Sequence, residues 1–189
     1  MGNVACKTDD CYMAEYYYKK VLLIFLGVVL LFVLGSCQKQ ERENNIAKQE
    51  AQIDTYVESQ MRDSVVFNNG VYRIIKRFGN GAELEKGDSV YFYYAIYKFS
   101  SGKGELYVTN QDSVAKANNF CVTSEPKSAV LNRKNFIPGL FYGMDGMQQG
   151  EYSNLVFSSR NGYGNDVVYN IGKNVPLFVE VWIEKIVKN

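Results

Sequence analysis

One uncharged stretch near the N-terminus sets how much of this chain can form a folded domain. Residues 21–34 carry no charge over 14 positions, and Lys19 and Lys20 precede them. A transmembrane helix needs about 20 apolar residues, whereas the core of a signal peptide needs only about 7–15. The length of the stretch therefore predicts an export signal that does not belong to the fold. A buried core helix or a transmembrane helix is the alternative.

The residues that follow this stretch indicate which type of export signal it is. Residues 34–37 (Leu-Gly-Ser-Cys) resemble the lipobox of bacterial lipoproteins, which implies removal of residues 1–36 and acylation, such as palmitate, on Cys37. Two or more acyl chains anchor a protein to a membrane that it does not cross. The resemblance thus implies a lipid-anchored protein of the bacterial cell envelope, periplasmic or surface-exposed, with the outer membrane as the expected location. Three acidic residues upstream of the lysines are untypical of a cationic leader, which leaves Met13 as an alternative start.

The amino-acid composition excludes several kinds of catalytic and binding site. The sequence contains no histidine, which excludes histidine-based catalytic triads, histidine-ligated zinc and imidazole proton switches. A formal net charge of +1 gives no reason to expect nucleic acid, because phosphate binding needs a basic field. The carboxylates are scattered without the spacing of a calcium loop. We therefore expect no metal, no cofactor and no nucleic-acid partner.

The segment after the lipobox is predicted to be a tether that leads into a helix. Residues 38–45 are polar or charged throughout, as expected of a solvated linker. Over residues 46–61, apolar positions such as Ile53 and Val57 recur at a spacing that favours one face of an amphipathic helix. We assign residues 37–64 to the lipidated tether and this helix. Its expected role is a spacer or a brace packed on the domain, and a partner-binding helix is a less favoured alternative.

Residues 65–189 are predicted to form one α+β domain, because the rest of the chain is long enough for one core but not comfortably for two. A single short helical signal begins at Pro138, where Leu140 and Met144 follow at helical spacing. Runs of aromatic and β-branched residues separated by turn signals favour strands over residues 71–78, 89–99, 105–109, 128–131, 151–159 and 177–187. The pattern predicts an antiparallel sheet with one short helix against it.

The last strand indicates how the sheet is buried. Leu177, Val179, Val181 and Ile183 alternate with Phe178, Glu180, Trp182 and Glu184, and alternate residues of a strand point to opposite faces. The first set is expected to face the short helix. The only tryptophan is therefore expected on the outer face, where the N-terminal helix could cover it.

The second half of the sequence resembles the FKBP-type peptidyl-prolyl isomerases. The resemblance rests on the order and spacing of Phe136-Ile137-Pro138-Gly139-Leu140, Gly146-Met147, Gly150-Glu151, Leu155, Phe157, Gly162-Tyr163-Gly164 and residues 177–181. Upstream, residues 87–90 with Tyr94 resemble an early strand of the family. The resemblance covers roughly residues 71–187. It implies a curved antiparallel β-sheet wrapped around the short helix and an apolar pocket in which a peptide bond before proline rotates.

The resemblance also implies which residues would form that pocket. Tyr94 matches a wall tyrosine, Ile137 matches an isoleucine whose backbone amide faces the ligand, and Tyr163 matches a tyrosine whose hydroxyl holds a ligand carbonyl. These three are the expected catalytic residues. Further substrate-binding residues implied by the match are Tyr107, Phe136, Leu140 and Val179.

Several positions depart from the family pattern and leave the activity open. Leu140 stands where a floor tryptophan is usual, Val179 and Lys127 stand where phenylalanines are usual, and the family's aspartate is absent after Tyr107. The resemblance implies a peptidyl-prolyl isomerase or a chaperone-like binder of exported polypeptides. A non-catalytic protein-binding or assembly module of the same fold is the alternative. A glycan-binding surface lipoprotein is a less favoured third possibility, since tyrosines at positions 91, 93 and 97 form a stripe on one strand face.

Overall fold

The structure is a computed structural model of residues 1–189, and it describes residues 8–60, 64–121 and 124–189. Within the long first helix, the side chains of residues 8–16 and 27–38, including that of Cys37, lie outside this description. The chain divides into one unit that ends at Asn44 and a compact unit Asn45–Asn189. In the part of the chain that is described, no helix has the length and apolar character needed to cross a membrane.

The first helix is longer than the sequence predicts. The helix α1 spans Thr8–Ser59, so that the predicted linker over residues 38–45 is helical. Glutamate, glutamine, lysine and arginine dominate this segment and favour helix almost as well as leucine does, which explains the continuation. The compact unit begins inside α1, whose last four turns bury Ile46, Ile53 and Val57. Ile53 and Val57 belong to an apolar cluster with residues of the sheet.

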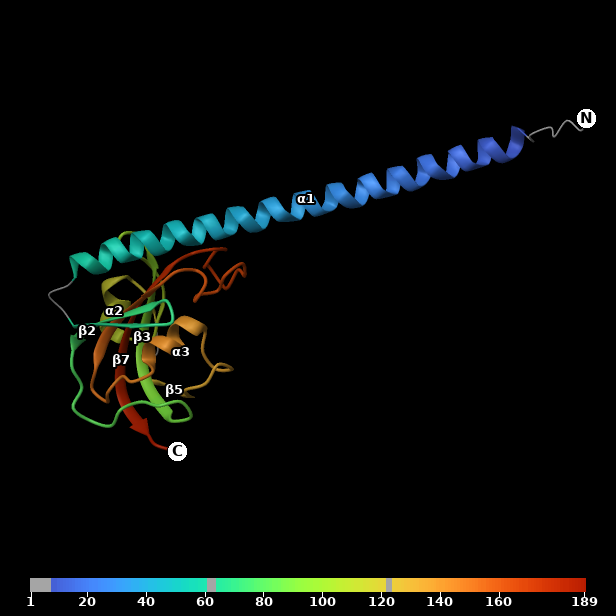
Figure 1. Ribbon diagram of the computed structural model, residues 1–189. Coiled ribbons are helices and arrows are strands. Elements are labelled where there is room, and N and C mark those ends of the chain that lie inside the picture. Colours follow the sequence, from blue (N-terminus) through green and yellow to red (C-terminus); the bar gives the residue numbers. More distant parts are fainter. Residues whose placement is uncertain (1–7, 61–63, 122–123) are drawn as a thin grey trace, which may run out of the picture. The chain divides into compact units, whose positions relative to one another are not determined.

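A single antiparallel sheet forms the body of the compact unit (Figure 1). Its strands are β1 (Ser64–Asn68), β2 (Val71–Arg77), β3 (Ser89–Phe99), β4 (Lys103–Thr109), β5 (Lys127–Val130), β6 (Tyr152–Phe157) and β7 (Leu177–Val187). Their order across the sheet is β1-β2-β6-β7-β3-β4, and β5 pairs with the first half of β3. The two long strands β3 and β7 pair along almost their whole length. The first strand, β1, is not among the predicted strands.

The two faces of the sheet bury two separate apolar clusters. The inner face packs against the short helix α3 (Pro138–Met144) and includes Leu177, Val179, Val181 and Ile183. The outer face packs against the end of α1 and includes Tyr97, Val156 and Phe178 together with Ile53 and Val57. Trp182 is partly buried and packs against this outer cluster. The predicted facing of the last strand is confirmed.

The helix α3 approaches the sheet closely because two of its residues have no side chain. A β-carbon on Gly139 would overlap the ring of Phe157, and one on Gly143 would lie 2.6 Å from Cδ1 of Leu155. Both glycines therefore let α3 rest directly on β6. The amide of Gly139 also donates a 2.7 Å hydrogen bond to the carbonyl of Asn161, which ties α3 to the loop after β6.

A second short helix lies in the segment that joins β4 to β5. The helix α2 spans Asp112–Ala117 and buries only Ala115. The sequence offers no apolar periodicity there, which is why it is not predicted. A 2.9 Å hydrogen bond from the amide of Ala115 to the carbonyl of Gln111 closes its first turn.

Candidate functional site

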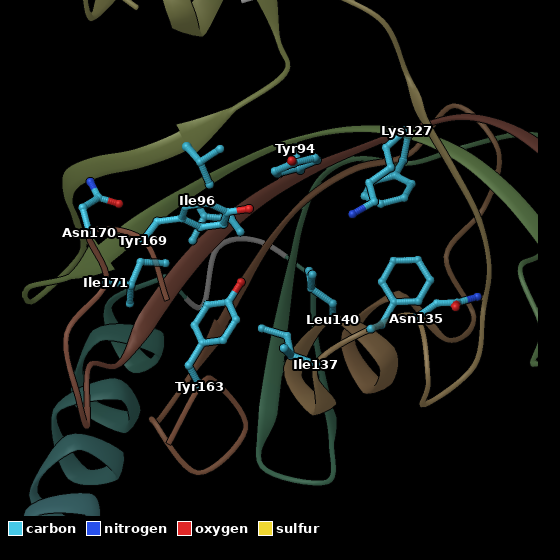
Figure 2. Close-up of a pocket in the computed structure, with 13 residues that line it drawn as sticks. Tyr94, Ile96, Lys127, Asn135, Ile137, Leu140, Tyr163, Tyr169, Asn170 and Ile171 are labelled. Atoms are coloured by element: carbon cyan, nitrogen blue, oxygen red, sulfur yellow. The ribbon is translucent and has the colours of Figure 1, made fainter. Parts of the chain in front are cut away.

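A largely apolar hollow of about 370 Å³ opens on the inner side of the sheet, between β3, the start of α3 and the loop that precedes β7. Its lining consists of Phe92, Tyr94, Ile96, Val108, Lys127, Asn135, Phe136, Ile137, Leu140, Tyr163, Tyr169, Asn170 and Ile171. In Figure 2, Tyr163 and Ile137 point into the hollow from one side and Tyr94 lies across from them. The hollow is therefore bounded by aromatic rings from three separate segments of the chain.

The strand β3 supplies one wall, and the end of β4 fixes its position. The carbonyl of Tyr94 accepts hydrogen bonds from the hydroxyl of Thr109 at 2.8 Å and from the amide of Asn110 at 3.2 Å. The side-chain oxygen of Asn110 accepts a 2.7 Å hydrogen bond from the amide of Tyr94. Phe92 and Ile96 point to the same side as Tyr94, because they lie two residues away along the strand. Phe92 packs with its ring centroid 5.8 Å from that of Tyr94.

The start of α3 supplies the floor. Ile137 precedes the first helical residue, Pro138, and has extended backbone angles of φ −61° and ψ 154°. The residue before a proline favours such angles, and proline suits the first helical position because its missing N–H needs no partner there. Phe136 packs against Phe92 at a centroid distance of 5.6 Å, while Leu140 faces the hollow one turn later. Among the described residues, none accepts a hydrogen bond from the amide of Ile137.

The loop between β6 and β7 supplies two tyrosines. Tyr163 is partly buried, and burial raises the pKa of its hydroxyl, with smaller contributions from Tyr94 and Tyr169. Burial likewise raises the pKa of Tyr94, with a smaller contribution from Tyr169. In the described part of the chain, neither hydroxyl has a hydrogen-bond partner. At neutral pH the pocket therefore presents two protonated phenols that are able to donate to a ligand.

Tyr169 lies at the tip of a two-residue turn. Val168 and Ile171 exchange backbone hydrogen bonds of 3.1 and 2.9 Å on either side of it. Tyr169 has a positive φ of 53° and is 96% exposed, a conformation that is uncommon for a bulky residue. The turn thus holds an aromatic ring over the mouth of the hollow.

Lys127 is the one charged residue that lines the hollow in the part of the chain that the structure describes. Its ammonium lies 5.9 Å from the centroid of the Tyr94 ring, within the range of a cation–π contact. The residues 110–126 that are described do not line the hollow.

Comparison with known proteins identifies the family. A family model of FKBP-type peptidyl-prolyl cis-trans isomerases matches residues 80–184, more than half of the chain. The chain belongs to the FKBP-type peptidyl-prolyl isomerase family. No curated protein matches the sequence at a significant level.

Two solved structures have the same FKBP-type fold. The crystal structure of FkpA from Escherichia coli matches with a TM-score of 0.57 and 20% sequence identity, covering 90% of this chain and 72% of that one. A peptidyl-prolyl cis-trans isomerase from Pseudomonas syringae matches with a TM-score of 0.55 and 17% identity, covering 75% of this chain and 95% of that one. The predicted α+β fold, with its antiparallel sheet around a short helix and a helix at the N-terminus, is confirmed.

The FKBP-type pocket contains most of the residues that the sequence suggests. Tyr94, Ile137, Tyr163, Phe136 and Leu140 all line it. Tyr107 and Val179 do not line it: Tyr107 is partly buried beside the inner core, and Val179 is fully buried within it. Because valine is smaller than the phenylalanine usual in the family, its side chain ends inside the core.

The structure adds residues that the sequence comparison misses. Phe92 and Ile96 share a strand face with Tyr94, so that the alternation rule could have found them. Tyr169, Asn170 and Ile171 come from an irregular loop without a periodic pattern. Phe92 and Phe136 supply aromatic surface beside Leu140, where the family has a tryptophan.

Proposed function

We propose that the protein accelerates the cis–trans rotation of peptide bonds before proline in exported polypeptides. The observation that carries this proposal is the apolar hollow in which Tyr94, Phe136 and Tyr163 surround a space open to solvent. Rotation about a peptide bond is opposed by a barrier of roughly 18–20 kcal/mol, because twisting breaks amide resonance. The reaction requires no nucleophile and no metal, which is consistent with a chain that has no histidine.

The residues of the pocket supply the two contributions that this reaction needs. Aromatic and aliphatic walls hold the proline ring and exclude water, which favours the less polar twisted amide. The amide of Ile137 and the hydroxyl of Tyr163 hold the carbonyls that flank the rotating bond. These donors bind the backbone of the substrate. The pocket therefore recognises the proline and few of the other side chains of the substrate.

The location of this activity is part of the proposal. The lipobox-like residues 34–37 support cleavage before Cys37 and acylation of its sulfur and new N-terminus. The mature protein is then anchored to the bacterial envelope, with the outer membrane as the favoured site, and acts on chains that have crossed the inner membrane. Radioactive palmitate labelling of the full chain, compared with a Cys37→Ala variant, tests the anchor.

The isomerase activity is tested on the chain from residue 38 onward, which contains the whole compact unit Asn45–Asn189. The protein is expected to accelerate relaxation of a short proline peptide from its cis excess. Tyr163→Phe removes one hydrogen bond to the substrate and is expected to lower kcat/KM about fivefold to tenfold. Tyr91→Phe changes a tyrosine that lines no part of the hollow and serves as the matched control. No acceleration by the unaltered protein would rule out the enzymatic function.

A second candidate is non-catalytic binding of unfolded chains, as in a chaperone or assembly module. It is favoured by one observation: Leu140 forms the floor where the family has a tryptophan, which reduces the surface that grips a proline ring. This candidate predicts suppression of aggregation of a reduced client protein without peptide isomerisation. Under this candidate, Leu140→Trp is expected to introduce measurable isomerisation, whereas under the first proposal it changes the existing rate little.

A further inference from the structure

A second cavity lies on the outer face of the same sheet, and it differs from the isomerase pocket in character. It has a volume of about 400 Å³ and is predominantly polar. Its lining includes Tyr93 and Trp182 together with Arg77, Gln111, Gln149 and Glu184. We propose that this outer cavity binds a neutral saccharide unit of a glycan.

The sheet register places the two aromatic residues of this cavity in one row with Tyr152. Tyr152 on β6 lies opposite Trp182 on β7, and Trp182 lies opposite Tyr93 on β3. A register shift in β2 between Ile75 and Arg77 places Arg77 opposite Tyr152 at the end of the row. One line across four strands thus carries a guanidinium and three aromatic rings.

The indole of Trp182 is held rigidly by its neighbour. The rings of Tyr152 and Trp182 are stacked with centroids 4.8 Å apart and an interplanar angle of 1°. Tyr152 does not line the cavity, whereas Trp182 and Tyr93 do. Tyr152 therefore supports the indole from outside the cavity, while Trp182 itself contributes to the cavity lining.

The buried carboxylate of Glu180 holds the ring of Tyr152 in place. Glu180 is only 5% exposed and accepts hydrogen bonds from the hydroxyls of Tyr152 at 2.8 Å and Tyr97 at 2.9 Å. Lys103 pairs with it at 3.2 Å. A buried charge is costly unless its oxygens are satisfied, and the isomerase pocket makes no use of it. Its effect is to lock the Tyr152 ring on which the tryptophan stacks.

The polar groups of the cavity suit hydroxyl groups better than a charged ligand. One arginine and one glutamate line the cavity, so that their formal charges cancel and no net field selects an anion or a cation. Guanidinium, carboxylate and amide groups are planar and bind pairs of neighbouring hydrogen-bonding groups. The side-chain oxygen of Gln149 is fixed by a 3.0 Å hydrogen bond from the amide of Ile186, which orients its nitrogen.

A saccharide has both an apolar face that can stack on aromatic rings and hydroxyl groups that can bond to planar polar side chains. The C–H face of a sugar ring stacks on aromatic rings, and its rim of hydroxyls bonds to planar polar side chains. A cavity of this size lies near the lower end of the roughly 300–1,000 Å³ typical of small-molecule sites, which fits one or two sugar rings. The outer cavity and the isomerase pocket lie on opposite faces of β3, so that the inference stands apart from the proposed catalytic function.

Trp182 makes the test direct, because it is the only tryptophan in the chain. The full chain, kept in a detergent without a sugar headgroup, is titrated with cellobiose, maltose and di-N-acetylchitobiose while its tryptophan emission is followed. A saturable change with at least one disaccharide is expected, with matching heat in calorimetry. Absence of both signals with all three disaccharides would overturn the proposal.

Variants separate the outer cavity from other binding surfaces. Tyr93→Ala and Gln111→Ala are each expected to weaken the saccharide about tenfold while proline isomerisation stays unchanged, and Gln111→Ala keeps every aromatic packing contact. Tyr163→Phe is expected to leave saccharide binding unchanged. Equal affinity in the unaltered protein and in both cavity variants would place the saccharide elsewhere and contradict the assignment.

Discussion

The ammonium of Lys127 lies 5.9 Å from the centre of the Tyr94 ring, at the edge of an otherwise uncharged, largely apolar pocket. Lys127 is exposed to solvent, which screens part of its charge, so that its field acts only on groups close to the edge of the pocket. It should attract a substrate that carries a negative charge beside the proline. The consequence is a preference among proline peptides that the backbone contacts alone would not produce.

This preference can be measured with two peptides that differ only before the proline. We expect kcat/KM to be about threefold to tenfold higher for a peptide with glutamate at this position than for one with lysine, which corresponds to roughly 1 kcal/mol. Lys127→Glu should reverse the order, and the difference should shrink at high salt. Equal rates for both peptides would contradict the preference while leaving the isomerase activity itself intact.

The activity is expected to be independent of pH from about 6 to 9. Burial raises the pKa of both Tyr94 and Tyr163 above the ordinary value of about 10, so that both hydroxyls stay protonated over this range. The chain has no histidine that could titrate near neutrality. A profile of kcat/KM against pH checks this, and a bell-shaped profile centred near pH 7 would require a different catalytic group.

Gly139→Ala is expected to destabilise the fold although alanine favours helix. Helix propensity alone would stabilise the protein by about 1 kcal/mol, but the new methyl group would overlap the buried ring of Phe157. Overpacking of this kind costs roughly 1–3 kcal/mol. Urea denaturation measures the net effect. Gly172→Ala is the matched control, since its β-carbon would lie at an ordinary 3.8 Å from Val175, and a more stable Gly139→Ala variant would refute the close packing.

The end of α1 should be an integral part of the compact unit. Ile53 is 2% exposed in the outer cluster, and truncation of a buried isoleucine costs about 2–5 kcal/mol. Ile53→Ala is therefore expected to lower the free energy of unfolding by this amount, whereas Gln52→Ala on the exposed side should change it little. Identical unfolding curves for Ile53→Ala and the unaltered chain would show that the helix is only a tether.

Secondary-structure elements whose apolar residues recur with a strong period could be predicted from the sequence. The strands 89–99 and 177–187 and the start of the short helix at Pro138 agree with the structure, because alternation and the proline signal are local properties. The extension of α1 through residues 38–45 and the helix α2 were not predicted. In both places the residues are polar, so that no apolar period indicates the structure they adopt.

The pocket could be predicted in part for a similar reason. Tyr94, Ile137 and Tyr163 lie in recognisable motifs, and they line one hollow. Tyr169 could not be found, because its position depends on the turn that Val168 and Ile171 close. Val179 was expected to line the hollow and does not, since the length of a side chain decides whether it reaches through the core. The roles of these residues in catalysis stay predictions until they are tested.

Tyr93 and Tyr94 are neighbours on β3, yet one lines the outer cavity and the other the isomerase pocket. Insertion or deletion of a single residue upstream in this strand would exchange their sides and dismantle both sites at once. Neither site can therefore be remodelled by sliding the strand. Changes to either proposed site that keep the other intact are therefore expected as substitutions or as changes in the loops.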